Sequence, residues 1–125
     1  MRGINDHRID GTINGHIAIT ATDPVGEGGS NAEYSIITKD DTTRLKFHRG
    51  QVADIARPNG ITNEALAAIL IDRLRGVQGL NVTGVAPLPS REGGKALEHF
   101  EEGLAWLQKR TRDRISRGVE GKLVP

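Results

Sequence analysis

Alternating polar and apolar residues near the N-terminus predict a β-hairpin. Residues 8–13 and residues 16–20 alternate on either side of the pair Asn14-Gly15. Asn and Gly tolerate the positive φ angles of a type I′ turn, which commonly connects two antiparallel strands. The pattern therefore predicts a strand, a two-residue turn and a second strand within this segment.

A second pair of strands is predicted further along the chain. Residues 33–38 (EYSIIT) and 43–48 (TRLKFH) are rich in β-branched and aromatic side chains, and the turn-forming residues 39–41 (KDD) lie between them. Residues 23–31 (DPVGEGGSN) have the Pro, Gly and Ser content of an exposed loop. We expect the two hairpins to form one four-stranded antiparallel sheet, followed by a loop over residues 49–60.

The second half of the chain carries the periodicity and the end signals of helices. Thr62 offers an N-cap hydroxyl to a helix over residues 63–75, with the acidic Glu64 in its first turn. We expect Gly76 to end this helix. Residues 77–90 contain two Gly and two Pro, so they are predicted to form a connector.

A longer helix is predicted over residues 91–117, capped by Ser90 and ended by Gly118. One of its faces is apolar at intervals of three and four residues, which suits packing against the first helix. The residues of this stripe are Leu97, Phe100, Leu104, Leu107, Thr111 and Ile115.

Charge is sorted along the longer helix. The acidic residues of its first half are Glu92, Glu98, Glu101 and Glu102. The basic residues of its second half are Lys109, Arg110, Arg112, Arg114 and Arg117. This order complements the helix macrodipole at both ends. The basic half is therefore explained equally well as a solvated helix end and as an anion-binding site.

These elements predict an α+β protein, in which a small N-terminal antiparallel sheet of two hairpins precedes an antiparallel helical hairpin. We expect a single domain over residues 1–125. Within it, the β-rich part occupies residues 1–60, the helical hairpin residues 61–121, and a short tail residues 122–125.

Composition predicts a thin core. Only 36% of the 125 residues are hydrophobic, with one Trp, one Tyr and two Phe, so we expect association with further copies to complete apolar burial. The chain has no cysteine, which is typical of a reducing compartment. No stretch is apolar enough for a membrane span or a signal peptide. We therefore expect a cytoplasmic protein without a membrane partner.

Net charge argues against a protein that binds nucleic acid along its backbone. The formal charge is +1 at pH 7. Affinity for DNA or RNA depends on the number of phosphates that basic residues neutralise. We therefore expect binding to nucleic acid to be weak, and any attraction for anions to be local.

Two residues of the predicted hairpin are candidates for contact with a ligand or a neighbouring subunit. Arg73 falls between the directions of Leu66 and Ile69, on the apolar side of the first helix. A guanidinium there extends past the helix end, pairs with a carboxylate, or meets an anionic ligand or another subunit. Trp106 projects away from the apolar stripe, on the side of Arg110. Its indole suits either a subunit interface or a stacked base.

The sequence offers no arrangement typical of catalysis. Its histidines lack the paired spacing of a zinc site. They are His7, His16, His48 and His99. The adjacent Glu101 and Glu102 point apart on a helix, so they do not form an acid and base pair. The Gly-rich loop over residues 26–31 lacks the lysine and the following helix of a phosphate-binding loop. We expect a binding protein rather than an enzyme, with no cofactor and no metal.

Several motifs of the second half match a known pattern when taken together. They are NGITNEAL at residues 59–66, IDRL at 71–74, SRE at 90–92, LEHFEEGLAWL at 97–107, RTRDR at 110–114 and RGVEG at 117–121. This pattern resembles the hairpin domain of phage anti-defence sponge proteins, the anti-CBASS and Thoeris anti-defence group. Phe47 with Gly50 resembles the aromatic-plus-glycine segment of some members. Gln51 and the pair Gly93-Gly94 depart from the family pattern.

The resemblance implies a phage protein that sequesters immune-signalling nucleotides, either cyclic oligonucleotides or cyclic ADP-ribose isomers, without cleaving them. It also implies a homo-oligomer, a dimer or a hexamer, with ligand pockets between subunits. The candidate contacts are Arg73, Arg110 and Arg114 for phosphates, Asn59 and Thr62 for base or ribose, and Phe47 or Trp106 for base stacking.

Two alternatives stay open at the level of sequence. The basic residues 109–117 also suit a small phage nucleic-acid-binding protein, although the acidic residues of the same helix weaken such binding. A structural or assembly role would instead produce stable oligomers that ignore every nucleotide.

Overall fold

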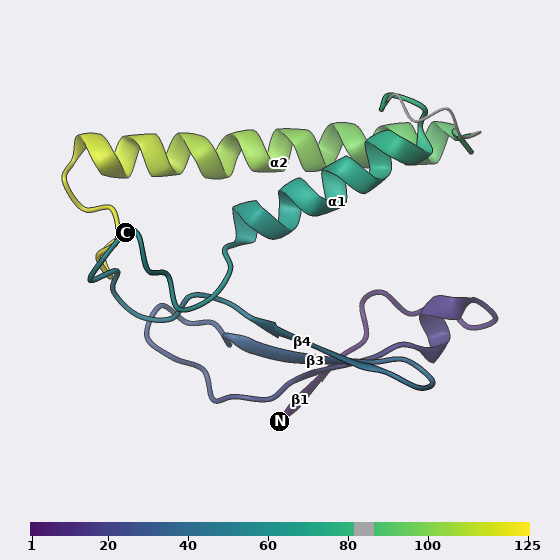
Figure 1. The fold of residues 1–125 in the computed structure, drawn as a ribbon, viewed down its shortest axis with the longest axis horizontal. Coiled ribbons are helices and arrows are strands. Elements are labelled where there is room, and N and C mark those ends of the chain that lie inside the picture. The colour runs from purple at the N-terminus through teal and green to yellow at the C-terminus, as the bar shows by residue number, and fades with distance from the viewer. Residues whose placement is uncertain (82–86) are drawn as a thin grey trace. The chain divides into compact units, whose positions relative to one another are not determined.

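The computed structural model describes residues 1–81 and 87–125. The chain forms two compact units, one made of Met1–Ile61 with Gly121–Pro125 and the other of Thr62–Glu120 (Figure 1). Residues 82–86, within the predicted connector, lie outside the described residues. The prediction of a single domain stays a prediction.

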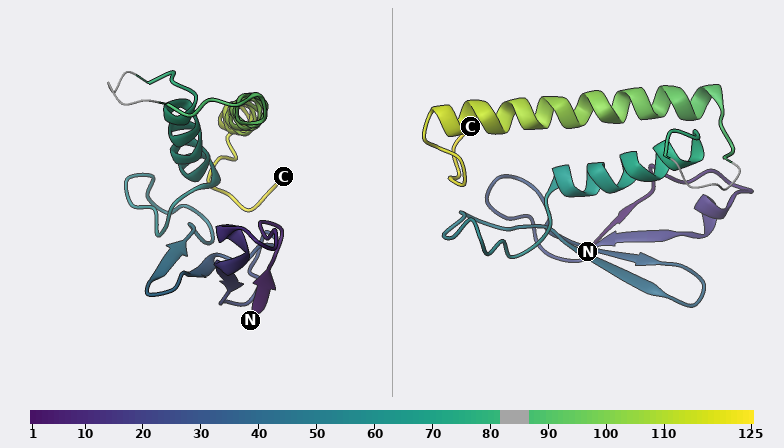
Figure 2. Two further views of the ribbon diagram at one scale, coloured as in Figure 1. Left: turned by 90° about the vertical axis from the view of Figure 1, so that its right-hand side faces the viewer. Right: turned by 45° about the horizontal axis from the view of Figure 1, so that its top comes forward.

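The first unit contains one four-stranded antiparallel sheet. Its strands, hydrogen-bonded in chain order, are β1 (Arg2–Ile4), β2 (Ala18–Ala21), β3 (Glu33–Ile37) and β4 (Thr42–Lys46). Figure 2 shows the strands of this sheet from two further directions. Together with the two helices of the second unit, the sheet confirms the predicted α+β class.

The first predicted hairpin is wrong. A short 3₁₀ helix, η1 (Ile13–His16), replaces the expected turn, and β2 pairs with β1 rather than with residues 8–13. The backbone N–H of Gly15 donates to the carbonyl of Thr12 at 3.0 Å. This local bond closes a helical turn. Since neither Asn14 nor Gly15 has a positive φ angle, the type I′ turn does not form.

The second predicted hairpin is confirmed, with an earlier end to its last strand. β3 and β4 pair over their whole lengths. The strand predicted to end at His48 ends at Lys46, because Phe47 leaves the sheet and forms a parallel bridge with Ile61. The backbone N–H of Ile61 donates to the carbonyl of Lys46 at 2.8 Å. This bridge ties the last residue of the first unit's main segment to the end of β4.

The second unit is a helical hairpin. Its helices α1 (Asn63–Val77) and α2 (Arg91–Ser116) lie side by side in Figures 1 and 2. Thr62 and Ser90 cap them as predicted, because their hydroxyl oxygens accept the backbone N–H groups of Ala65 at 3.1 Å and Gly93 at 2.9 Å. Within the described residues, neither helix is long and apolar enough to cross a membrane.

Both helices end at a glycine in a left-handed conformation. Gly118, with a φ angle of 71°, follows α2 as predicted. After α1 this position belongs to Gly79, with a φ angle of 79°, so the prediction that Gly76 ends the helix is wrong. The backbone N–H of Leu80 donates to the carbonyl of Arg75 at 2.9 Å. Such Schellman bonds satisfy the last carbonyl groups of a helix.

The least exposed side of α2 follows a heptad spacing. Its residues are Leu97, Leu104, Leu107, Thr111 and Arg114. The predicted stripe also contained Phe100 and ended at Ile115. Both assignments are wrong, because Phe100 is 42% and Ile115 is 62% exposed, whereas Arg114 is 3% exposed. Steps of three and four residues keep side chains facing one partner helix. The steps alternate from Leu104 onward, so the step of four from Leu107 to Thr111 is followed by a step of three to Arg114.

The core is as thin as composition predicts. Among residues 1–81 and 87–125, the buried hydrophobic residues are Ala21, Ala32, Ile71 and Leu97. Larger apolar side chains stay exposed on α1 at Ile69, Leu70 and Val77. Polar contacts therefore contribute much of what holds neighbouring elements together.

Gln78 ties the end of α1 to the start of α2. Its side-chain amide donates to the carbonyl of Ser90 at 2.9 Å, and its side-chain carbonyl accepts the backbone N–H of Ser90 at 3.0 Å. A Cβ atom at Gly93 would lie 2.6 Å from Oε1 of Gln78. The glycine at this unusual position therefore leaves room for the Gln78 amide.

Replacement of Gly93 tests this contact. We expect Gly93→Ala to lower the free energy of unfolding by about 1–2 kcal/mol, because the new methyl group displaces the Gln78 amide from its two hydrogen bonds. Gly103→Ala is the matched control, since no atom lies within 4 Å of a Cβ there. It should raise stability by about 0.5–1 kcal/mol. Denaturant unfolding that shows both variants equally stabilised would contradict this account.

Candidate functional site

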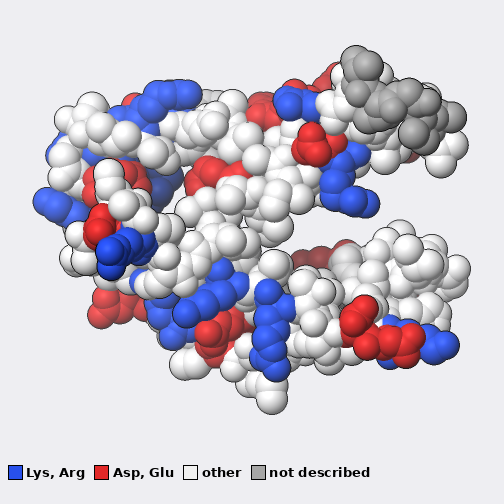
Figure 3. All heavy atoms as spheres, in the orientation of Figure 1, with Lys and Arg blue, Asp and Glu red and all other residues white. Residues whose placement is uncertain are grey.

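An open groove lies on the exposed side of α2. It is lined by Trp106, Lys109, Arg110, Asp113 and Arg117, and it has a volume of about 280 Å³. These residues recur at three- and four-residue intervals, which places them on one side of the helix. Figure 3 shows basic side chains gathered over the C-terminal half of α2. We call this surface the α2 groove.

The α2 groove combines a flat aromatic ring with basic groups. Trp106 is 63% exposed. Nζ of Lys109 donates to Oδ2 of Asp113 at 3.0 Å. Within the described residues no carboxylate pairs with Arg110, so its planar guanidinium can take a phosphate in a bidentate contact. An indole and a guanidinium side by side are suited to stacking a base and holding a phosphate.

Arg114 has a structural environment, unlike Arg110. Its Nε donates to Oε2 of Glu120 at 3.1 Å, and its Nη2 donates to the carbonyl of Val119 at 2.8 Å. These bonds hold the segment after α2 against the buried side of the helix. Arg114 does not line the α2 groove, and its predicted contact with a phosphate stays a prediction.

Arg73 lies on an exposed side of α1. The buried side of this helix is centred on Ile71, whereas Ile69 is 58% exposed. The face that the sequence marks as apolar is therefore open to solvent beside Arg73, which is itself exposed. A solvated guanidinium needs no compensating partner. Its role as a phosphate contact also stays a prediction.

Asn59 and Thr62 are both engaged in backbone contacts. The side-chain carbonyl of Asn59 accepts the backbone N–H of Arg49 at 2.7 Å, and its amide donates to the carbonyl of Arg49 at 2.9 Å. The backbone N–H of Asn59 donates to Nδ1 of His48 at 3.0 Å. The hydroxyl of Thr62 caps α1. Both residues therefore have a structural task in addition to the ligand contacts expected of them.

Phe47 lies directly after β4, in the first unit. Its ring contacts the ring of Tyr34 edge-on, with 5.7 Å between the ring centroids. A Cβ atom at Gly60 would lie 2.4 Å from the backbone carbon of Phe47, so only glycine fits beside it. Phe47 is half-buried and retains an exposed part that could meet a ligand.

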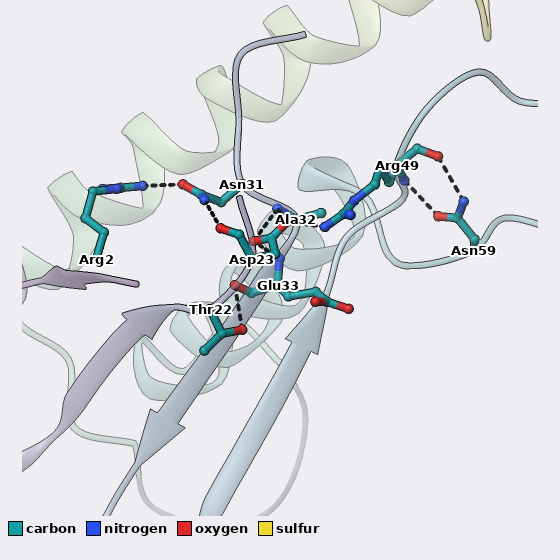
Figure 4. Close-up of polar contacts among 8 residues, drawn as sticks. All are labelled: Arg2, Thr22, Asp23, Asn31, Ala32, Glu33, Arg49 and Asn59. Atoms are coloured by element: carbon teal, nitrogen blue, oxygen red, sulfur yellow. Dashed lines mark hydrogen bonds and ion pairs between the residues drawn. The ribbon is translucent and has the colours of Figure 1, made fainter. Parts of the chain in front are cut away.

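The carboxylate of Asp23 is the centre of a polar network in this unit (Figure 4). It accepts the backbone N–H of Ala32 at 2.9 Å and that of Glu33 at 3.0 Å, and it pairs with the guanidinium of Arg49. The Asp23 side chain is 3% exposed. Burial would raise the pKa of Asp23, but the Ala32 and Glu33 N–H groups and Arg49 outweigh it and hold the pKa below the ordinary 3.8.

Asn31 extends this network to the N-terminal strand. Its amide donates to the backbone carbonyl of Asp23 at 2.6 Å, and its side-chain carbonyl accepts from Nη2 of Arg2 at 2.7 Å (Figure 4). These contacts close the base of the loop over residues 23–31. The loop is exposed at its tip, as predicted, but it is pinned at both ends.

Two of these residues, Asp113 and Asp23, escaped the sequence analysis. Asp113 lies seven residues after Trp106, so helical spacing alone identifies it. The Asp-Pro pair at the start of the loop is a known turn signal. The pairing of Asp23 with Arg49 has no such local signal, because the two residues are far apart along the chain.

Measurements of stability test whether Arg114 has a structural role that Arg110 lacks. Arg114→Ala should lower the free energy of unfolding by about 2–3 kcal/mol, because a buried guanidinium is lost together with its hydrogen bonds to Glu120 and Val119. Arg110→Ala should change it by less than about 0.5 kcal/mol, as is usual for an exposed side chain. Thermal unfolding without any ligand measures both. Equal losses would show that Arg110 also has a structural role.

The Asp23 network predicts a pH dependence of stability. Its folded pKa lies below 3.8, so ionised Asp23 contributes stability that is complete above this value. The contribution is lost as the pH falls below 3.8 and through the folded pKa. The melting temperature of Asp23→Asn should therefore lie below that of the wild type at neutral pH, and the difference should shrink on acidification. A pH-independent difference would contradict this, and Asp40→Asn, on an exposed turn, is the control.

Part of the chain matches a known protein family. Residues 40–112 match the family model described as Acb2/Tad1, hairpin domain. The matched region contains α1, most of α2, and the residues Phe47, Trp106 and Arg110. It covers more than half of the chain.

A relative with a known role comes from a phage. Thoeris anti-defense 1 of Bacillus phage SBSphiJ7 is 36% identical over 99 residues, which cover 77% of this chain. The chain spans 63% of the length of that relative. From the match of residues 40–112 and this phage relative, we conclude that the chain belongs to the Acb2/Tad1 hairpin-domain family of phage anti-defence proteins.

Proposed function

We propose that the protein binds immune-signalling nucleotides and sequesters them without cleavage, and so inhibits bacterial anti-phage defence. The nucleotides are cyclic oligonucleotides, cyclic ADP-ribose isomers or both. The observation that carries this proposal is the α2 groove, where the exposed Trp106 lies beside Arg110 within the matched region. An aromatic face and a bidentate cation are the two contacts that a nucleotide requires.

The composition of the α2 groove favours binding over chemistry. Its one carboxylate, Asp113, is paired with Lys109, and its five lining residues include no histidine, serine, threonine or cysteine. Hydrolysis requires a positioned base or nucleophile, whereas sequestration requires only contacts that are held in place. In the part of the chain that the structure describes, no three His, Asp or Glu side chains gather as a metal site does.

We further propose that the protein is a homo-oligomer, a dimer or a hexamer, acting in the host cytoplasm. The α2 groove is open, and a second subunit placed over it would shield a bound nucleotide from water. Apolar side chains such as Ile69, Leu70 and Trp106 are exposed in the single chain. Contact with another copy would bury side chains of this kind, and tryptophan and arginine are enriched at such interfaces.

Thermal melting against a panel of cyclic dinucleotides, cyclic trinucleotides and cyclic ADP-ribose isomers tests the proposed function. A nucleotide present at about 100 times its Kd should stabilise the protein by about 2.7 kcal/mol and raise the melting temperature. Arg110→Ala should remove most of this shift, because the phosphate contact is lost. Arg112→Ala should keep it, since Arg112 is an exposed arginine of α2 outside the groove.

Three outcomes would contradict this proposal. If no nucleotide raises the melting temperature, the chain matches the family but does not bind these nucleotides. A complex with DNA that survives above physiological salt would favour the nucleic-acid-binding alternative. Stable oligomers that ignore every nucleotide would favour a structural or assembly role.

A further inference from the structure

The α2 groove contains a carboxylate among its basic side chains. Asp113 lines the groove together with Lys109, Arg110 and Arg117. Its negative charge weakens the attraction of the groove for a phosphate, because like charges repel. A groove that contacted only phosphate would therefore bind it better without this residue. A carboxylate at such a place contributes to binding only where the ligand presents a hydrogen-bond donor to it.

The position of Asp113 is unfavourable for the helix itself. It lies in the last turn of α2, which ends at Ser116, and the helix macrodipole favours cations there. Lys109 precedes Asp113 by four residues and pairs with it, but lysine followed by an acid stabilises a helix less than the reverse order. Both side chains are more than half exposed, so water and salt screen their attraction. Helix stability therefore does not account for this carboxylate.

Lys109 holds the Asp113 carboxylate and leaves it able to accept further hydrogen bonds. Nζ of Lys109 donates to Oδ2 at 3.0 Å, and each carboxylate oxygen can accept more than one hydrogen bond. The Asp113 side chain is 59% exposed, so a ligand in the groove can reach it. The pairing also restricts the direction of the side chain, which reduces the entropy lost when a ligand binds.

The spacing of Arg110 and Asp113 suits two adjacent groups of one ligand. Residues three apart on a helix are surface neighbours, with about 5–6 Å between their Cβ atoms. In a ribonucleotide that carries a 3′-phosphate, this phosphate and the 2′-hydroxyl are attached to neighbouring carbons of the ribose. A guanidinium donates to the phosphate, whereas a carboxylate accepts from the hydroxyl. Carboxylates recognise ribose hydroxyls in the same way at dinucleotide sites.

We propose that Asp113 is the ribose-recognition residue of the α2 groove, and that it accepts from a 2′-hydroxyl whose neighbouring 3′-phosphate is held by Arg110. This inference rests on the proposed function. It narrows the ligand to ribonucleotides with a free 2′-hydroxyl beside a phosphate, as in cyclic oligonucleotides joined 3′ to 5′. A 2′-deoxynucleotide has no donor at this place, so the carboxylate would meet the phosphate without compensation.

The chain provides a probe of the groove, because Trp106 is its single tryptophan. Titrations followed by the fluorescence of Trp106 compare cyclic di-AMP with its 2′-deoxy analogue. A second pair, adenosine 3′-monophosphate and 2′-deoxyadenosine 3′-monophosphate, carries the same groups without the ring. The wild type should bind each ribonucleotide about tenfold more tightly than its deoxy analogue, which is the lower end of what a hydrogen bond to a charged group contributes.

Replacement of Asp113 should affect the two kinds of ligand in opposite directions. In Asp113→Ala, the affinity for ribonucleotides should fall by about fivefold, because the hydroxyl loses its acceptor. The affinity for the deoxy analogues should rise by about twofold, because a charge that repels the phosphate is removed. Glu98→Ala is the matched control, since Glu98 is an exposed carboxylate of α2 that pairs with Lys95 and does not line the groove. It should keep the wild-type preference for ribose.

The outcomes separate this inference from the proposed function. If the wild type binds ribonucleotides and deoxy analogues equally, or if Asp113→Ala weakens both by the same factor, the role of Asp113 is overturned and sequestration stands. A raised melting temperature with cyclic di-AMP, without a change in Trp106 fluorescence, would place the nucleotide outside the groove and overturn it as well.

Two further outcomes concern the proposed function. Suppose that cyclic di-AMP does not bind, whereas adenosine 3′-monophosphate shows a preference for ribose that Asp113→Ala abolishes. The proposed function then fails for this cyclic nucleotide, and the role of Asp113 stands. If none of the four probes binds, both proposals are overturned for these nucleotides.

Discussion

The carboxylate of Asp23 accepts two backbone N–H groups at the start of β3 and pairs with Arg49 beyond the end of β4. Hydrogen bonds from these N–H groups and the charge of Arg49 favour the ionised form of this buried carboxylate and lower its pKa. The loop over residues 23–31, the first residues of β3 and the segment around Phe47 therefore depend on one charge. In a unit with few buried hydrophobic side chains, this polar centre replaces much of the ordering that an apolar core would supply.

The helical unit uses polar side chains in the same manner. Gln78 holds the start of α2 through two hydrogen bonds to Ser90. Arg114 occupies a heptad position where an apolar residue is usual, and its guanidinium holds the segment after α2. Because Arg114 takes part in the fold, the basic end of α2 contains two kinds of residue. Arg114 has a structural role, whereas the residues of the α2 groove are proposed to bind an anion. The helix dipole alone does not make this distinction.

The sequence predicted the elements whose signals are local. The two helices, the caps Thr62 and Ser90 and the hairpin of β3 and β4 follow from short patterns that the structure confirms. The prediction of a hairpin turn at Asn14-Gly15 was wrong. Local 3₁₀ hydrogen bonds form there instead, and β2 pairs with a strand formed by residues 2–4. Trp106 and Arg110 were found by helical spacing. Asp23 was missed, since its partner is distant along the chain and no periodicity connects them.

A protein that sequesters a nucleotide must return it unchanged, and this is the most direct test of the account. The purified protein is incubated with cyclic ADP-ribose and with cyclic di-AMP, separated from free nucleotide, and heated to release what it holds. Mass spectrometry of the released material should recover the intact cyclic nucleotide. A linearised or hydrolysed product would contradict sequestration and identify an enzyme.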